Sequence, residues 1–107
     1  MNETDNLEDK RKRLARWRIL KTLDAGRPYP VSQDLLLNVV QDADTQITEL
    51  GLRRSLNYLE QKGLVNIRKI FDPGVGEHDE YTLTDRGIDY VDYTTPDDAG
   101  IYRPRRI

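Results

Sequence analysis

A dense run of basic side chains lies near the start of the chain, between positions 10 and 21. Its members are Lys10, Arg11, Lys12, Arg13, Arg16, Arg18 and Lys21. Such side chains bind phosphate, and each phosphate that a protein neutralises adds affinity and salt sensitivity. Because the run points all around a helix, only part of it can face one partner, and Arg11, Lys12 and Arg16 are the candidate phosphate contacts. The alternative is that the run pairs with acids of the same chain.

The other reactive residue types do not form a catalytic or metal-binding set. The chain has no cysteine, and its one histidine, His78, lacks partners for a common zinc site. Ser32 and Ser55 lack a candidate base. The sequence GVG at residues 74–76 lacks the Lys and Ser/Thr that follow a phosphate-binding loop. We therefore predict a protein that is not an enzyme, with no metal, no cofactor and no identifiable small-molecule substrate.

Composition favours one small domain with a heavily charged surface. The 107 residues include 17 basic and 19 acidic side chains, for a net charge of −2. This balance gives no global attraction to nucleic acid, so any attraction must come from local clusters. No stretch approaches the roughly 20 apolar residues of a membrane span, and the acidic N-terminus does not resemble a secretory signal. A cytoplasmic protein without membrane contact is expected.

Three helices are predicted before residue 63. Apolar side chains recur at three and four residues within positions 7–25, and Gly26 then stops the helix. Ser32 is a suitable N-cap for a second helix that ends near Asp42. Either Thr45 or Thr48 caps the third helix, which covers about residues 48–62. Leucines at positions 52, 56 and 59 anchor one side of it.

The pattern then changes from helix to strand. Gly63 ends the third helix, and residues 64–71 and 80–83 are rich in β-forming types on either side of a Gly/Pro-rich loop. A short last helix follows Thr84. The predicted fold class is therefore mainly α with a small β-hairpin, in the order α-α-α-β-β-α. We expect a disordered N-terminus at 1–6, one domain at 7–92 and an extended tail at 93–107.

Two segments carry a resemblance to the winged helix-turn-helix superfamily of bacterial and phage transcriptional regulators. The sequence LNYLEQKGLV at residues 56–65 resembles the end of the family's recognition helix and the start of its wing. The sequence YTLTDRG at residues 81–87 is similar to the wing exit. Together they bracket a wing, and the resemblance covers roughly residues 14–92. Within the superfamily, residues 87–104 resemble small winged-helix proteins of Mu-like prophages.

The resemblance implies sequence-specific binding of double-stranded DNA, with the third helix in the major groove. Arginine can bond guanine there, and Asn or Gln can bond adenine. The candidate DNA-binding residues are Gln46, Thr48, Glu49, Arg53, Arg54, Asn57, Tyr58, Arg68 and Lys69. The alternative for the helix is an ordinary solvated face. For Arg68 and Lys69, the expectation is weakened by the acidic residues around the predicted wing tip.

The resemblance also implies a homodimer formed through the first and last helices, with Trp17 as a natural member of the contact. The alternative is that Trp17 completes the core of a monomer. The acidic wing and the overall acidity support a second hypothesis for function. In that hypothesis, the chain is a winged-helix module for protein–protein interaction that does not bind DNA.

Overall fold

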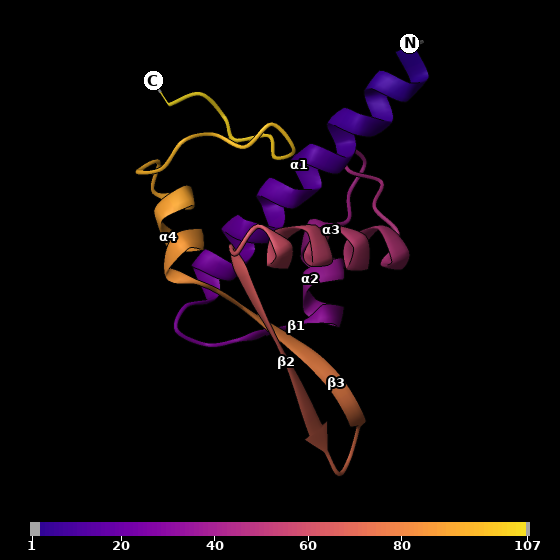
Figure 1. Ribbon diagram of the computed structural model, residues 1–107. Coiled ribbons are helices and arrows are strands. Elements are labelled where there is room, and N and C mark those ends of the chain that lie inside the picture. Colours follow the sequence, from indigo (N-terminus) through magenta and orange to yellow (C-terminus); the bar gives the residue numbers. More distant parts are fainter. Residues whose placement is uncertain (1–2, 107) are drawn as a thin grey trace.

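Four helices and a three-stranded antiparallel sheet make up the computed structural model, which describes residues 3–106 (Figure 1). The elements follow the order α1 (Glu3–Gly26), β1 (Val31–Ser32), α2 (Gln33–Val40), α3 (Glu49–Gln61), β2 (Val65–Asp72), β3 (Gly76–Leu83) and α4 (Asp85–Val91). The predicted succession of three helices, a hairpin and a last helix is confirmed.

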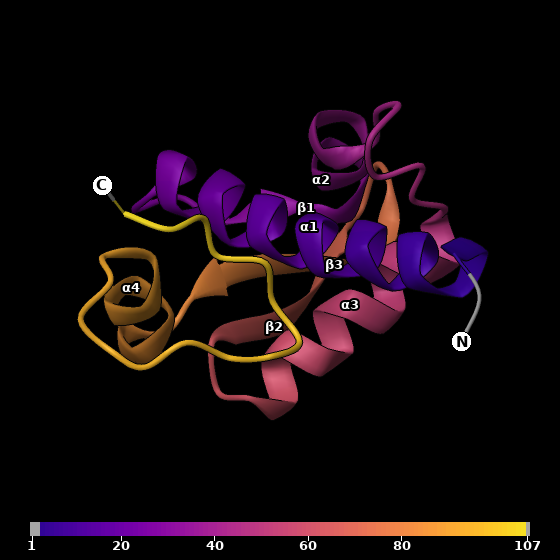
Figure 2. The same cartoon turned by 90° about the horizontal axis from the view of Figure 1, so that it is seen from above.

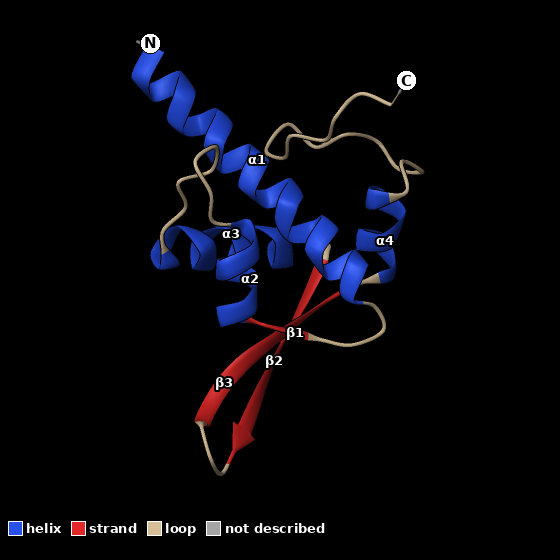
Figure 3. Cartoon of the chain, turned by 180° about the vertical axis from the view of Figure 1, so that it is seen from behind, coloured by secondary structure: helices blue, strands red, loops and turns tan. Residues whose placement is uncertain are grey.

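The sheet has the strand order β1-β3-β2, so β3 is its central strand. In the β2–β3 hairpin, Val65 pairs with Leu83 at the base and Asp72 with Gly76 at the tip. The hairpin projects away from the helices (Figure 3). The short strand β1 pairs Val31 with Tyr81, where the sequence pattern predicts no strand. Two residues are too few to show an alternating pattern, so sequence reasoning misses this strand.

The core lies where α1 crosses α3 and meets the base of the sheet (Figures 1 and 2). Its fully buried large side chains include Ile19, Leu20, Leu23, Leu36, Leu52, Leu56, Leu59, Val40 and Val65. Burial of apolar surface on this scale supplies the main force for folding and fixes the position of α3. None of the helices within residues 3–106 is long and apolar enough to cross a bilayer.

Side-chain caps begin three of the helices where the sequence predicts them. Ser32, Thr48 and Thr84 accept hydrogen bonds from the amides of Leu35, Gly51 and Gly87. Each cap satisfies a backbone N–H that has no partner within its helix, typically stabilising it by about 1 kcal/mol. After α3, Gly63 adopts a φ of 77°, a left-handed conformation that favours glycine. These caps fix both ends of α3.

The N-terminal boundary differs from the expectation. The helix α1 begins at Glu3, whereas the predicted helix begins at residue 7, and residues 1 and 2 lie outside the described part. No proline or glycine occurs within residues 3–25, so the sequence contains no helix-breaking residue that would delay the start of α1 until residue 7.

The segment after α4 has no regular secondary structure, but it is packed onto the domain. Ile101 is only 3% exposed and belongs to the core. The amide of Tyr102 donates to the carbonyl of Arg13 in α1 at 3.0 Å. The Arg103 guanidinium lies over the rings of Tyr90 and Tyr93, at 4.4 and 4.9 Å from their centroids. The predicted extended tail therefore folds back over α1 (Figure 2) and is part of the same structural unit.

Candidate nucleic-acid interface

One side of α3 is fixed to the core, and the opposite side is exposed. Leu52, Leu56 and Leu59 are at most 1% exposed and hold the inner side. Exposed residues recur at three- and four-residue spacing on the other side, so they form one stripe. This stripe, the outer face of α3, consists of Glu49, Leu50, Arg53, Arg54, Asn57, Glu60 and Gln61. Four of the predicted DNA-binding residues, Glu49, Arg53, Arg54 and Asn57, are therefore presented together on one helix.

Arg53 has an acidic partner one turn earlier. Its Nη2 atom donates to Oε1 of Glu49 at 3.0 Å, and the same oxygen accepts from Nε2 of Gln33 at 3.2 Å. The Arg53 and Glu49 side chains are 60% and 59% exposed, and pairs of this kind contribute at most about 1 kcal/mol. Arg53 can therefore exchange Glu49 for a base or a phosphate at little cost.

Arg54 lies on the side of α3 that faces α1. It lines a cleft between α3 and α1, to which α1 contributes Arg11 and Lys12. The loop before α3 contributes Gln46 and Thr48 to the same cleft. With Arg16 of α1, the structure thus brings six sequence-predicted contact residues, four of them cations, to one concave surface.

Arg16 and Tyr58, two of the predicted contact residues, also contact the C-terminal segment of the same chain. The Arg16 guanidinium lies 3.8 Å from the centre of the Tyr58 ring and donates to the carbonyl of Gly100 at 3.0 Å. The Tyr58 hydroxyl donates to Asp98 at 2.5 Å. Burial lowers the pKa of Arg16 and raises the pKa of Tyr58 from their ordinary values. Both side chains thus hold the C-terminal segment against α1 and α3.

Asp98 completes this internal cluster. Burial alone would raise the pKa of Asp98, but hydrogen bonds from Tyr58 and Gly100 and the charge of Lys62 together lower it. The Lys62 Nζ atom lies 3.4 Å from the Asp98 carboxylate. Sequence reasoning does not identify Asp98, because no local pattern reveals a partner 40 positions earlier.

Arg68 and Lys69 of β2 both lie opposite acids. Arg68 is paired in register with Glu80 and Lys69 with Asp79. The Lys69 Nζ atom also lies 3.5 Å from Glu77. Because adjacent strand residues point to opposite faces, only one of the two can face α3. Lys69 shares a groove with Arg53 and is therefore the residue on the α3 side.

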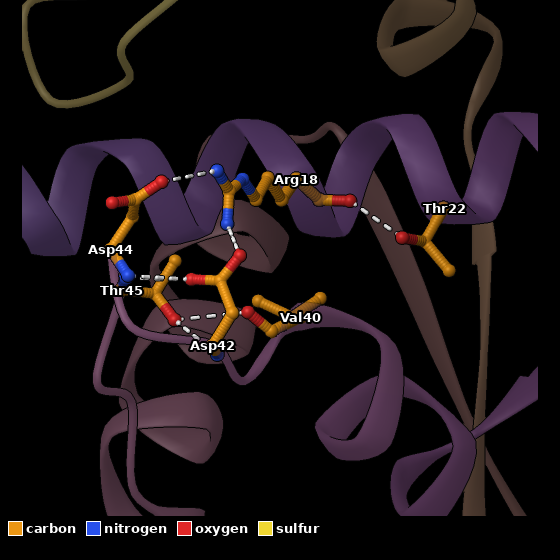
Figure 4. A network of polar contacts seen from close by, with 6 residues as sticks. All are labelled: Arg18, Thr22, Val40, Asp42, Asp44 and Thr45. Atoms are coloured by element: carbon orange, nitrogen blue, oxygen red, sulfur yellow. Dashed lines mark hydrogen bonds and ion pairs between the residues drawn. The ribbon is translucent and has the colours of Figure 1, made fainter.

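A polar network positions the N-terminus of α3 relative to α1 (Figure 4). Asp42 accepts hydrogen bonds from the amides of Asp44 and Thr45, both at 2.9 Å, and pairs with Arg18 of α1. The buried Thr45 hydroxyl donates to the carbonyl of Val40 at 2.9 Å. Thr48 is therefore the helix cap, and Thr45 holds the loop. The loop between α2 and α3 is thereby tied to the helix that forms the other wall of the cleft.

Asp42 makes the stability of this loop sensitive to acid. Hydrogen bonds from the amides of Thr45 and Asp44 and the charge of Arg18 lower the pKa of Asp42 below its ordinary value. A carboxylate with a lowered folded-state pKa stabilises the protein above its unfolded pKa of about 4 and loses this contribution as the pH falls through the folded value. Asp42→Asn should therefore lower the free energy of unfolding at pH 7, and urea titrations should show the deficit shrinking below about pH 4. A deficit that is equal at pH 7 and pH 3 would contradict this role.

Comparison with known proteins identifies the fold. No family model and no curated protein matches the chain. The crystal structure of a candidate DNA-binding protein from Ralstonia eutropha has a TM-score of 0.55 at 21% identity, covering 77% of this chain and 95% of that one. Bacillus subtilis PadR, in a crystal structure with operator DNA, has a TM-score of 0.61 at 20% identity over 89% of this chain. The chain has a winged-helix fold.

In this winged helix, α3 leads into the β2–β3 hairpin, which is the wing. The match spans only 52% of the PadR chain, so this domain corresponds to about half of that protein. A groove of about 570 Å³ separates the wing from the N-termini of α2 and α3. Its acidic lining residues are Asp34, Glu49, Asp72, Glu77 and Asp79, against the cations Arg53 and Lys69. The wing side of α3 is therefore electrostatically unfavourable for phosphate.

Proposed function

We propose that this chain binds double-stranded DNA as a transcriptional regulator, with the outer face of α3 in the major groove. The observation that carries the proposal is the exposure of Arg53, Arg54 and Asn57 together on a capped, leucine-anchored helix. Arginine forms bidentate hydrogen bonds with guanine, and asparagine does so with adenine. The similar PadR structure, which is described as a complex with operator DNA, supports the proposal.

We further propose that the binding is sequence-specific, and that Leu50 takes part in it. Leu50 is 56% exposed between the cap and Arg53. Apolar side chains on a recognition helix can contact the methyl group of thymine. Sequence reasoning missed Leu50 because it appears as one more leucine. The signal is its position, which falls outside the buried stripe formed by Leu52, Leu56 and Leu59.

The predicted homodimer and the Mu-like prophage origin remain proposals, as does the cytoplasmic location. The Trp17 ring packs in T-shaped geometry against the rings of Tyr90 and Tyr93, with ring centroids 6.3 and 6.0 Å apart. Trp17 is thus used within one chain, as the monomer alternative expects. A dimer through α1 and α4 would have to use other side chains, and sedimentation equilibrium with and without DNA measures its presence directly.

The proposal is tested by selecting ligands from a random duplex pool. Their affinity is then measured by fluorescence anisotropy between about 50 and 200 mM salt, where the salt dependence reports the number of phosphate contacts. We expect an enriched sequence motif. We also expect the logarithm of the association constant to fall linearly with the logarithm of the salt concentration, with a slope of about −0.9 per neutralised phosphate. An unenriched pool together with no binding to any duplex at low salt would overturn the proposal.

A second candidate function is a protein-interaction module. The observation that favours it is the wing tip, where Phe71 and Val75 are 74% and 75% exposed beside the acids of the groove. An apolar tip with acidic flanks suits a protein partner better than a phosphate backbone. Phe71→Ser would leave duplex affinity unchanged under the DNA-binding proposal, because the tip then takes no part in binding. Loss of duplex binding in this variant would show that the wing tip belongs to the DNA interface.

A further inference from the structure

One face of α1, the loop before α3 and the first half of α3 form the walls of the cleft between α1 and α3. Its α1 wall consists of Glu8, Arg11, Lys12, Ala15 and Arg16, which follow at three- and four-residue spacing and so occupy one face of the helix. Its other walls are the loop before α3 and the first half of α3, and the cavity holds about 530 Å³. The small residues Ala15 and Gly51 line the cleft and leave room between the two helices.

The charge in this cleft is predominantly positive. The cations Arg11, Lys12, Arg16 and Arg54 line it together with a single acid, Glu8. The Arg16 guanidinium is held by Tyr58 and Gly100, which leaves Arg11, Lys12 and Arg54. Among the side chains that the structure describes, from residue 6 to residue 106, no carboxylate lies within 4.0 Å of these three cations. Their charges are therefore available to a ligand. The N-terminus of α3 adds the positive end of a helix dipole at the same place.

We infer that this cleft binds a phosphate of the DNA backbone, so that the duplex lies against the α1 side of α3 and not between α3 and the wing. The inference rests on the proposed function and specifies how the duplex is oriented. A duplex that receives α3 in its major groove presents a phosphate strand on each side of the helix. The wing side presents an acidic groove, and the α1 side presents Arg11, Lys12 and Arg54. Phosphate contacts of this kind set register and orientation and carry no base specificity.

The walls of the cleft are held in place before any ligand arrives. The pair between Arg18 and Asp42 ties the loop before α3 to α1. Within the loop, Nε2 of Gln41 donates to the carbonyl of Ile47 at 2.9 Å. A site that is already ordered loses little conformational freedom on binding. This preorganisation distinguishes the cleft from a set of surface lysines.

The test replaces Arg11 and Lys12 and compares the double variant with a control that removes one charge from α1 outside the cleft. Arg11→Gln/Lys12→Gln should lower the affinity for a selected duplex about tenfold at 0.1 M salt and reduce the salt slope by about 1, without changing the preferred sequence. Lys10→Gln removes a charge from the same turn, but Lys10 is exposed and does not line the cleft. Its salt slope should stay at the wild-type value.

A duplex with neutral methylphosphonate linkages locates the phosphate. Neutralising the contacted phosphate should weaken wild-type binding and leave the Arg11→Gln/Lys12→Gln variant unaffected. Free inorganic phosphate at millimolar concentration should not compete, because the proposed ligand is the duplex backbone; competition would instead assign the cleft to a free anion. Equal effects of neutralisation in wild type and variant, or equal losses in the variant and Lys10→Gln, would overturn the inference. Failure of the wild type to bind any duplex would overturn the proposed function itself, so the two failures are distinguishable.

Discussion

Replacing both Arg53 and Arg54 with alanine should lower the affinity for a selected duplex by about 2 to 4 kcal/mol, or roughly 30- to 1000-fold. Both guanidinium groups lie on the outer face of α3, where they can reach base edges or phosphates. Neither contributes apolar burial to the core, so the variant should remain folded. The preferred sequence should also become less defined, because base contacts carry the specificity. Anisotropy with the selected duplex and with one scrambled sequence measures both effects.

Two comparison variants sharpen this test. Lys10→Ala/Lys21→Ala removes the same amount of charge from exposed positions of α1, and it should change affinity only slightly at 0.15 M salt, where screening acts within about 8 Å. Glu49→Gln removes the acid that pairs with Arg53 at 3.0 Å. It should raise duplex affinity several-fold, because a negative charge near phosphate is lost. If the Arg53→Ala/Arg54→Ala and Lys10→Ala/Lys21→Ala variants lose the same affinity, α3 has no special part in binding.

Gly87→Ala should destabilise the protein by about 3 kcal/mol or more, with a fall in Tm of about 10 to 20 °C. Gly87 is buried in the first turn of α4, and an added Cβ atom would lie 2.1 Å from the carbonyl oxygen of Leu64. That oxygen accepts a hydrogen bond from the amide of Thr84 at 3.1 Å, and the Thr84 hydroxyl donates to the carbonyl of Gly63 at 2.6 Å. The clash is with backbone, so α4 must move away from the base of the wing. Thermal unfolding followed by circular dichroism measures the change.

Gly74→Ala provides the matched control for Gly87. Gly74 is exposed at the wing tip, and the nearest atom to an added Cβ is the Asp72 side chain at 3.6 Å. This variant should stay within about 0.5 kcal/mol of the wild type. A wild-type Tm for Gly87→Ala would contradict the close packing of α4 on the start of β2.

Local signals in the sequence were sufficient to predict the helical part of the fold. Ser32, Thr48 and Thr84 are side-chain caps, and the leucines at 52, 56 and 59 mark the buried side of α3. Gly63 ends α3 in the predicted left-handed conformation. These features act within one or two helical turns, so the residues that form them are neighbours in the sequence.

Long-range contacts account for what sequence reasoning missed. Residues 93–106 contain one isolated buried apolar residue, Ile101, and no periodic pattern. Their position depends on Arg103 over two tyrosine rings and on Asp98 with Tyr58. The same contacts engage Arg16 and Tyr58, two of the predicted contact residues, within the chain. A sequence pattern shows which face of a helix is polar, but it does not show which polar residues a distant segment covers.

Chemical-shift mapping tests the central claim, that α3 presents its outer face to DNA, most directly. Titrating ¹⁵N-labelled protein with the selected duplex should shift amide signals mainly at residues 46–61 of the described chain and at residues 8–12 of α1. The wing tip at 72–76 and the helix α4 should change little. Shifts confined to the wing tip or the C-terminal segment, or no shifts at any duplex concentration, would contradict the account.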